Sequence, residues 1–434
     1  MNSDVAGIAL VLALVALYAA SARRLDRLSV TGAMVFTGAG LLLGAEFLDI
    51  LPAAIETESV KLLAEVTLAV ILFTDASAVN ARAARDDSGL DGRMLGIGLP
   101  FMVAAGAAAA WLIFPGLGWA GAALLAAVVA PTDAALGLAV FTDRAVPARV
   151  RRVLNVESGL NDGLATPLVV FFIAVVAAEE VSGSRAVSDA VLDIGIGVIA
   201  GCAVGAIGAL LLLFGRGRGA TTPQSEDIGV LALAVLAYAA AVALSGNGFV
   251  AAFVGGLALG AAARGRLRER VEVSEAVAVV LSLLVWTIFG ALLVGPVLAD
   301  GLEWRPVLYA VLSLAALRMA SVALALTGTG ARAPTRVFMG WFGPRGLASV
   351  VFALLVVIEL ESVAPAIADE ITATATWTIL LSVILHGLSA RPLGRRYGAW
   401  AARLGADVFE RVPAAEAPRR RRAMSGDHTS DGRD

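Results

Sequence analysis

The chain has 434 residues, of which 59% are hydrophobic and only 16% charged, and its formal net charge is −3. Soluble domains carry about 25% charged residues, so this composition excludes an ordinary soluble domain and indicates a polytopic membrane protein. Cys202 is the only cysteine, which excludes an intrachain disulfide and a thiolate metal cluster. The first apolar run lacks a basic n-region and a small-residue cleavage site, and we expect it to be a retained span.

Windows of about 20 apolar residues, separated by charged or Gly/Pro-rich loops, predict an all-α fold. Thirteen transmembrane helices are expected, at about residues 5–22, 28–48, 60–79, 94–114, 119–141, 154–178, 190–214, 227–245, 248–263, 275–298, 306–328, 335–358 and 370–390. We expect the fifth, sixth and twelfth to be irregular. Residues 392–434 are expected to form a short, disordered cytoplasmic tail, in which Arg419 to Arg422 either contact anionic lipid or stay solvated.

Arginine is distributed unevenly among the loops between these helices. The odd-numbered loops contain Arg23, Arg24, Arg27, Arg82, Arg85, Arg93, Arg144, Arg149, Arg151, Arg152, Arg216, Arg218, Arg264, Arg266, Arg268, Arg270, Arg332 and Arg336. The even-numbered loops hold only Arg185 and Arg305, with Lys61 at a span edge, and are otherwise acidic. The positive-inside rule then predicts a multi-pass protein of the cell (inner) membrane, with the N-terminus outside and the C-terminus in the cytoplasm.

Two predicted helices contain helix-breaking residues. The fifth breaks at Pro131 and the twelfth at Gly343-Pro344. Interruptions at corresponding positions of two halves are typical of inverted repeats, in which two discontinuous helices cross near the membrane midplane and form an ion site.

Two carboxylates, Asp133 and Asp162, interrupt apolar runs long enough to cross a bilayer. An ionisable group at that depth costs about 2.5–3.5 kcal/mol and usually marks an ion or proton pathway. Ser158 lies four residues before Asp162 and therefore shares its helix face. Together with the carbonyl of Thr132 beside the proline, these oxygens predict a site for Na⁺ or K⁺, because oxygen ligands can replace the hydration shell of such cations.

A carboxylate in a low dielectric holds a proton more readily than one in water. Protons and cations then compete for the same oxygens, which predicts exchange: the site loads one, crosses the membrane, releases it and loads the other. The alternative, in which these acids are neutral helix-packing groups, is disfavoured because two motifs and a proline converge on one region.

These residues resemble the monovalent cation/proton antiporters, specifically the NhaP-like sodium/proton exchangers. The resemblance runs in order over residues 5–395 and is carried by Pro131-Thr132-Asp133, Glu157-Ser158, Asn161-Asp162-Gly163, Gly343-Pro344-Arg345-Gly346 and His386-Gly387. It implies a homodimeric elevator transporter with no cofactor and no nucleic-acid partner. Within the transmembrane domain, residues 1–391, the dimerisation side would comprise about 5–93 and 227–298, and the ion-transporting core about 94–178 and 306–390.

The resemblance also implies roles for the candidate site residues. Asp162 would be the principal cation- and proton-binding carboxylate, with Asp133, Ser158 and the Thr132 carbonyl completing the shell. Asp75 matches an acidic position on the third span that reaches the ion through water in some relatives. The alternative for Asp75 is a solvated acid at a cytoplasmic helix end.

Glu157 should not remain a lone buried charge, because an unpaired one is very costly. The resemblance favours a pair between Glu157 and an arginine that orients Asn161 and braces the site. Two intramembrane arginines are available, and we prefer Arg318 as the partner. Arg345 lies at the helix break, where it can instead offset half-helix dipoles and the charge of Asp133.

Asn161 precedes Asp162 where electrogenic relatives have a second aspartate, so the resemblance implies electroneutral exchange of one cation for one proton. Sodium is the preferred cation, with K⁺ and Li⁺ left open. The rival class is a monovalent cation channel or uniporter, which would conduct without a pH gradient. An intramembrane protease is disfavoured, since neither Asp133 nor Asp162 lies in a Tyr-Asp or Gly-x-Gly-Asp pattern. We expect His386 to be a packed, hydrogen-bonded residue rather than a pH sensor.

Overall fold

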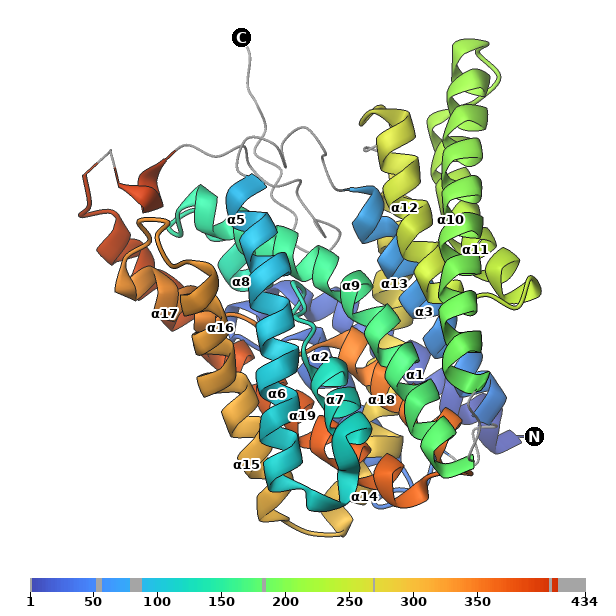
Figure 1. Cartoon of the computed structure of the whole chain (residues 1–434). Helices are drawn as coiled ribbons and strands as arrows, with labels where there is room; N and C mark the ends of the chain where they lie inside the picture. The colour runs from blue at the N-terminus through green and yellow to red at the C-terminus, as the bar shows by residue number, and fades with distance from the viewer. Residues whose placement is uncertain are drawn as a thin grey trace.

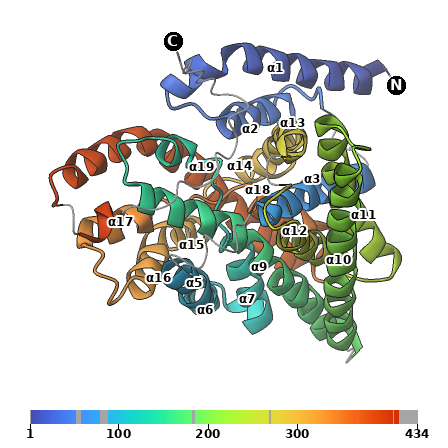
Figure 2. The same ribbon diagram turned by 90° about the horizontal axis from the view of Figure 1, so that it is seen from above.

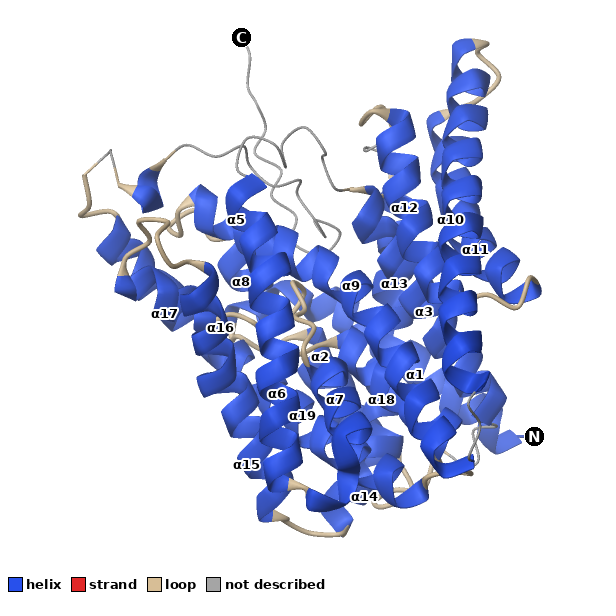
Figure 3. Cartoon of the chain, in the orientation of Figure 1, coloured by secondary structure: helices blue, strands red, loops and turns tan. Residues whose placement is uncertain are grey.

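The computed structural model describes residues 2–51, 57–78, 88–181, 185–267, 270–405 and 408–412. Over these ranges the chain forms helices and no strand (Figure 3), which confirms the predicted all-α class. Seven helices in this part are long and apolar enough to cross a membrane, by length and composition: Gly89–Ile113, Ala148–Glu179, Val187–Gly217, Pro223–Ala243, Glu272–Ala299, Trp304–Ala325 and Pro365–Ala401.

Each of the thirteen predicted spans corresponds to one or more helical segments in the structure, although the number of membrane crossings stays a prediction. The α-helices are α1 (Asn2–Arg27), α2 (Gly32–Leu43), α3 (Thr57–Ser77), α5 (Ser88–Arg93), α6 (Leu99–Ile113), α7 (Gly118–Val129), α8 (Leu138–Phe141), α9 (Ala148–Val181), α10 (Arg185–Gly217), α11 (Pro223–Ala243), α12 (Gly248–Ala263), α13 (Glu272–Ile288), α14 (Gly295–Ala299), α15 (Trp304–Leu312), α16 (Arg318–Ala325), α17 (Ala333–Trp341), α18 (Leu347–Leu360) and α19 (Pro365–Ala401). Short 3₁₀ segments are η2 (Pro115–Leu117) and η6 (Phe409–Arg411), and π-helical turns are η1 (Met94–Gly98), η4 (Phe289–Val294) and η5 (Ser313–Leu317).

The predicted interruptions of the fifth and twelfth spans are confirmed, whereas the sixth span, expected to be irregular, is continuous. α7 ends at Val129 before Pro131, and α17 ends at Trp341 before Gly343-Pro344. The sixth span, α9, is one continuous helix of 34 residues that contains Pro167. Helices in membranes tolerate such a proline when neighbouring helices and local side chains satisfy the backbone groups that it frees.

Three further irregularities, which the sequence did not predict, are π-helical turns within spans. The turns η1, η4 and η5 interrupt the fourth, tenth and eleventh predicted spans. Such a turn widens the helix by one residue and often occurs at functional sites. The turn η5 ends immediately before Arg318, so it sets the direction in which this arginine leaves its helix.

The predicted tail begins too early. Residues 392–401, assigned to a disordered tail, continue α19 as helix. They are ordered by packing on α17, where the rings of Tyr397 and Phe338 stack with centroids 4.0 Å apart. Arg419 to Arg422, like the loop arginines Arg82, Arg85 and Arg268, lie outside the described residues.

The helices fall into groups that surround a central set. The central set consists of α7, α9 and α18. It lies between α15–α17 on one side and α10–α12 on the other, while α1 lies along an edge (Figures 1 and 2). Glycines permit the closest approach within the second group. A Cβ on Gly201 would lie 2.4 Å from the carbonyl oxygen of Ala251, so α10 and α12 pack backbone to backbone, as small residues allow in membranes.

Candidate functional site

The two interrupted helices meet at their breaks. The backbone N–H of Asp133 donates to the carbonyl of Pro344 at 2.7 Å. A Cβ on Gly346 would lie 2.0 Å from the Cβ of Asp133, so only glycine allows the two interrupted segments to approach this closely. The predicted crossing of two discontinuous helices is therefore present, and Asp133 lies within it.

The carboxylate of Asp133 accepts two backbone hydrogen bonds. Its Oδ1 accepts from the N–H of Ala135 at 2.6 Å, and its Oδ2 accepts from the N–H of Leu347 at 3.2 Å. Leu347 is the first residue of α18, and the N–H groups at a helix start carry a partial positive charge. Asp133, which belongs to the break after α7, thus caps the start of α18 beyond the other break.

Arg345 makes the reciprocal contact. Its side chain is fully buried, and Nη1 donates to the carbonyls of Ala130 at 2.9 Å and Pro131 at 3.3 Å. These carbonyls follow the last residue of α7, where the helix dipole is negative. We expected Pro131 to leave carbonyls open for a cation; instead Arg345 occupies those of Ala130 and Pro131.

The structure pairs Glu157 with Arg318 rather than with Arg345. Nη1 of Arg318 donates to Oε1 of Glu157 at 2.5 Å, and Nη2 donates to Oε2 at 2.8 Å. Both residues are 4% exposed. The geometry is a two-pronged guanidinium–carboxylate contact, the strongest form of such a pair. It joins α9 to α16 next to the second break, where Gly343 packs against the Arg318 guanidinium.

A buried network of hydroxyl and amide groups links the first break to α9. The hydroxyls of Thr132 and Ser158 lie 3.0 Å apart, and Nδ2 of Asn161 donates to Oγ1 of Thr132 at 2.6 Å. All three residues are at most 3% exposed. The structure therefore brings together three of the predicted site residues through their side chains.

Asp162 follows Asn161 on α9 and is 8% exposed. The next residue, Gly163, packs against the ring of Phe253 on α12, since a Cβ there would lie 2.0 Å from that ring. Asp162 thus belongs to the turn of α9 that borders the other group of helices. Asp75 is half-buried on α3, a helix that contacts both α9 and α12; its role as a ligand stays a prediction.

Two residues of the crossing were missed or only partly understood from the sequence. Ser382 on α19 accepts from the backbone N–H of Arg345 at 2.6 Å. His386, 1% exposed, contacts the carbonyl of Ser382 through Nδ1 at 2.9 Å and that of Trp341 through Nε2 at 2.8 Å. His386 is therefore a packed, hydrogen-bonded residue that holds α17 to α19. The sequence places Ser382 and His386 four residues apart, on one face of a helix, but nothing in the residues around Ser382 indicates its contact with Arg345.

The site thus offers carboxylate and hydroxyl oxygens beside the crossing of two broken helices. Two arginines fix the framework through Glu157 and the α7 carbonyls, so the oxygens of Asp133, Ser158 and Asp162 are the candidates for holding a cation. A polytopic helical protein built in this way has the architecture of a secondary ion transporter.

Comparison with known proteins places the chain within that class. The family model described as sodium/hydrogen exchanger, transmembrane, matches residues 10–396, and the chain belongs to this family. The K(+)/H(+) antiporter NhaP of Alkalimonas amylolytica is 27% identical over 295 residues, which are 67% of this chain and 49% of that protein. The K(+)/H(+) antiporter NhaP2 of Shewanella oneidensis is 30% identical over 257 residues, 57% of this chain and 43% of that protein.

A solved structure shows the same fold. The sodium proton antiporter MjNhaP1 from Methanocaldococcus jannaschii, at pH 8, matches with a TM-score of 0.74 and 20% identity, covering 88% of this chain and 99% of that one. The chain spans about half the length of the curated relatives that it matches. Membership of the family, together with the helices that are long and apolar enough to cross a membrane, indicates a multi-pass membrane protein.

Proposed function

We propose that this protein exchanges a monovalent cation, Na⁺ in preference to K⁺ or Li⁺, for H⁺. The observation that carries the proposal is the buried Thr132–Ser158–Asn161 network, which joins the break of α7 to the turn of α9 that bears Asp162. Cations and protons would compete for the carboxylates of Asp162 and Asp133, with the hydroxyl of Ser158 and the carbonyl of Thr132 completing the shell.

The relatives support both ions. Those from Alkalimonas and Shewanella are named K(+)/H(+) antiporters, whereas a relative from Schizosaccharomyces pombe, 24% identical over 314 residues, is named a Na(+)/H(+) antiporter. The preference for Na⁺ therefore rests on the resemblance of the site motifs, and the ion is an outcome of the experiment below.

The mechanism we propose is alternating access of the elevator type in a homodimer. The core, about 94–178 and 306–390, would move against the dimerisation side, about 5–93 and 227–298. The position of Asp162 on the turn of α9 that packs on α12 supports a site at the boundary of these two parts. Asn161 in place of a second aspartate supports electroneutral exchange, one cation for one proton. The protein would lie in the cell membrane with its N-terminus outside.

The test is cation-induced relaxation of a pH gradient in proteoliposomes, followed with a ΔpH-sensitive dye. Na⁺, K⁺ and Li⁺ are added separately, with the membrane potential clamped and unclamped. We expect Asp162→Asn to abolish the response in a folded protein. Asp300→Asn, at an exposed position following α14, is the matched control and should behave as wild type. Equal rates with and without the clamp would support electroneutrality.

The rival function is a cation channel or uniporter. It would carry current without a pH gradient and would show no coupling between cation addition and proton efflux. A wild-type protein that gives no response to any of the three cations between pH 6 and 9 would overturn the exchange proposal.

A further inference from the structure

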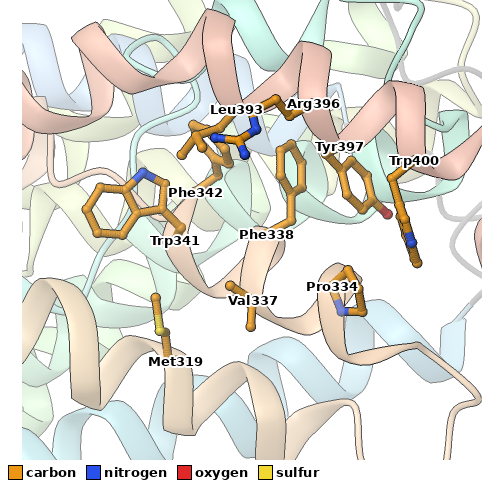
Figure 4. A pocket seen from close by; sticks show the side chains of 10 residues that line it. All are labelled: Met319, Pro334, Val337, Phe338, Trp341, Phe342, Leu393, Arg396, Tyr397 and Trp400. Atoms are coloured by element: carbon orange, nitrogen blue, oxygen red, sulfur yellow. The ribbon is translucent and has the colours of Figure 1, made fainter.

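A groove lies between α16, α17 and the end of α19, away from the crossing. It has a volume of about 650 Å³, within the range of about 300–1,000 Å³ typical of ligand pockets. Figure 4 shows its side chains, which come from all three helices. Its lining is apolar or aromatic except for Arg396, and includes Met319, Val337, Phe338, Phe342 and Trp400.

The aromatic wall of this groove is fixed by contacts of its own. The rings of Phe338 and Tyr397 stack at 4.0 Å, and the hydroxyl of Tyr397 lies 3.0 Å from that of Thr335. Nε1 of Trp341 donates to the hydroxyl of Ser389 at 2.9 Å. Because Tyr397 and Trp341 are held by Thr335 and Ser389, which lie outside the groove, the groove keeps its shape without an occupant.

Arg396 is the one charged residue of the lining. It is exposed, and Figure 4 shows its side chain extended over the edge of the groove near Leu393 and Phe342. Neighbouring arginines are occupied: Arg391 donates to the carbonyl of Arg27 at 3.3 Å, and Arg336 donates to that of Ala331 at 3.0 Å. Within the described residues Arg396 makes no hydrogen bond or ion pair. Its guanidinium is therefore available to an anion at the rim.

The groove lies where α19 leaves the apolar span. The sequence predicts that this span ends near residue 390, and the helix continues to Ala401 with arginines at 391, 395 and 396. Tryptophan and tyrosine gather at the boundary between hydrocarbon and headgroups, and Trp341, Tyr397 and Trp400 occupy this stretch. This placement would put the apolar lining at the depth of lipid chains and Arg396 at the depth of phosphates.

From this combination we propose that the groove binds one anionic phospholipid. An acyl chain lies along Val337, Phe338 and Phe342, and the phosphate group binds the guanidinium of Arg396. Charge complementarity favours an anionic lipid, because a basic residue next to the membrane surface attracts negative headgroups.

Such a lipid would contact the helices that hold the transport site. Met319 follows Arg318, and Phe342 precedes the break at Gly343. The two helices are close here, since a Cβ on Gly340 would lie 3.1 Å from the Cα of Met319. The lipid therefore ties α16 to α17 one residue away from the groups that frame the crossing.

The test measures binding directly and does not depend on exchange activity. Delipidated full-length protein in detergent is titrated with phosphatidylglycerol or phosphatidylcholine of identical chains, and bound lipid is counted by native mass spectrometry. We expect wild type to prefer phosphatidylglycerol. Arg396→Gln should lose roughly fivefold of that preference, the value of one basic residue at the surface. Arg395→Gln is the matched control, because Arg395 faces a separate pocket on the other side of α19, and it should retain the preference.

A second pair of variants tests the acyl-chain part. Val337→Trp should fill the groove and weaken binding of both lipids, since Val337 is 56% exposed and the larger ring has room. Leu324→Trp, on α16 at a position 43% exposed outside the groove, should bind as wild type. The proposal is overturned if wild type shows no preference between the lipids, if Arg395→Gln loses as much as Arg396→Gln, or if Val337→Trp binds normally.

Discussion

The pair between Glu157 and Arg318 allows the sharpest test of how the site is held together. Both residues are 4% exposed, and two hydrogen bonds of 2.5 and 2.8 Å join them. Replacing Glu157 by methionine keeps most of the side-chain volume but leaves the Arg318 guanidinium buried without its carboxylate. Removing one partner of a buried pair costs about 3–5 kcal/mol, whereas replacing both by apolar residues is often neutral or stabilising.

The assay is thermal unfolding of purified protein in detergent for Glu157→Met, Arg318→Met and the double variant. We expect each single variant to melt well below wild type and the double variant to recover most of the loss, which corresponds to a coupling of roughly 3 kcal/mol or more. Lys61→Met, whose partner Glu359 is 45% exposed, serves as the control and should melt near wild type. A double variant that melts lower than either single variant would refute the reasoning, because the pair would then be stabilising in its own right.

Three further predictions concern the crossing and its surroundings. Gly346→Ala should abolish folding or exchange, because its Cβ would lie 2.0 Å from that of Asp133, whereas Gly92→Ala, with open space around it, should express and transport as wild type; yield and exchange of the two variants decide this. Thr132→Val should lower the apparent cation affinity and destabilise the fold by about 1–3 kcal/mol, since Ser158 and Asn161 lose a buried hydrogen-bond partner. Thr132→Ser keeps the hydroxyl and should retain both affinity and stability, and a normal affinity in Thr132→Val would contradict the prediction. Lys61→Ala removes an exposed ion pair between α3 and α18, 2.6 Å long, worth at most about 1 kcal/mol, so exchange rates measured by stopped flow should change by no more than about fivefold.

The helix breaks and the identity of the site helices could be predicted because their signals are local. A proline at 131 and a Gly-Pro pair at 343–344 end helices by their own chemistry, and both breaks occur there. The partner of Glu157 could also be narrowed to two arginines, because few residues can neutralise a buried carboxylate within a membrane. That rule leaves Arg318 and Arg345 open; Arg318 is the preferred partner, and the structure pairs it with Glu157.

Other features could not be predicted because they depend on contacts distant in sequence. The sixth span was expected to be irregular, yet α9 continues as one helix through Pro167, since packing decides whether a proline breaks a membrane helix. Residues 392–401 read as a polar tail, but Tyr397 stacks on Phe338 of α17, and that contact keeps α19 helical. The contact between Ser382 and the backbone of Arg345 spans 37 residues and has no signature in either segment.

The two broken helices compensate each other's charges, and this bears on which carboxylate exchanges protons. Arg345, from the second break, binds the carbonyls at the end of α7, while Asp133, from the first break, binds the N–H at the start of α18. The carboxylate of Asp133 thus accepts two N–H donors, one of them at the positive end of a helix dipole. Asp162, in contrast, lies in the interior of α9, fourteen residues after its first residue Ala148. It is therefore far from the N–H groups at the start of its own helix. We infer that the carboxylate of Asp133 chiefly holds the two breaks together, and that Asp162 is the principal carboxylate for which cation and proton compete.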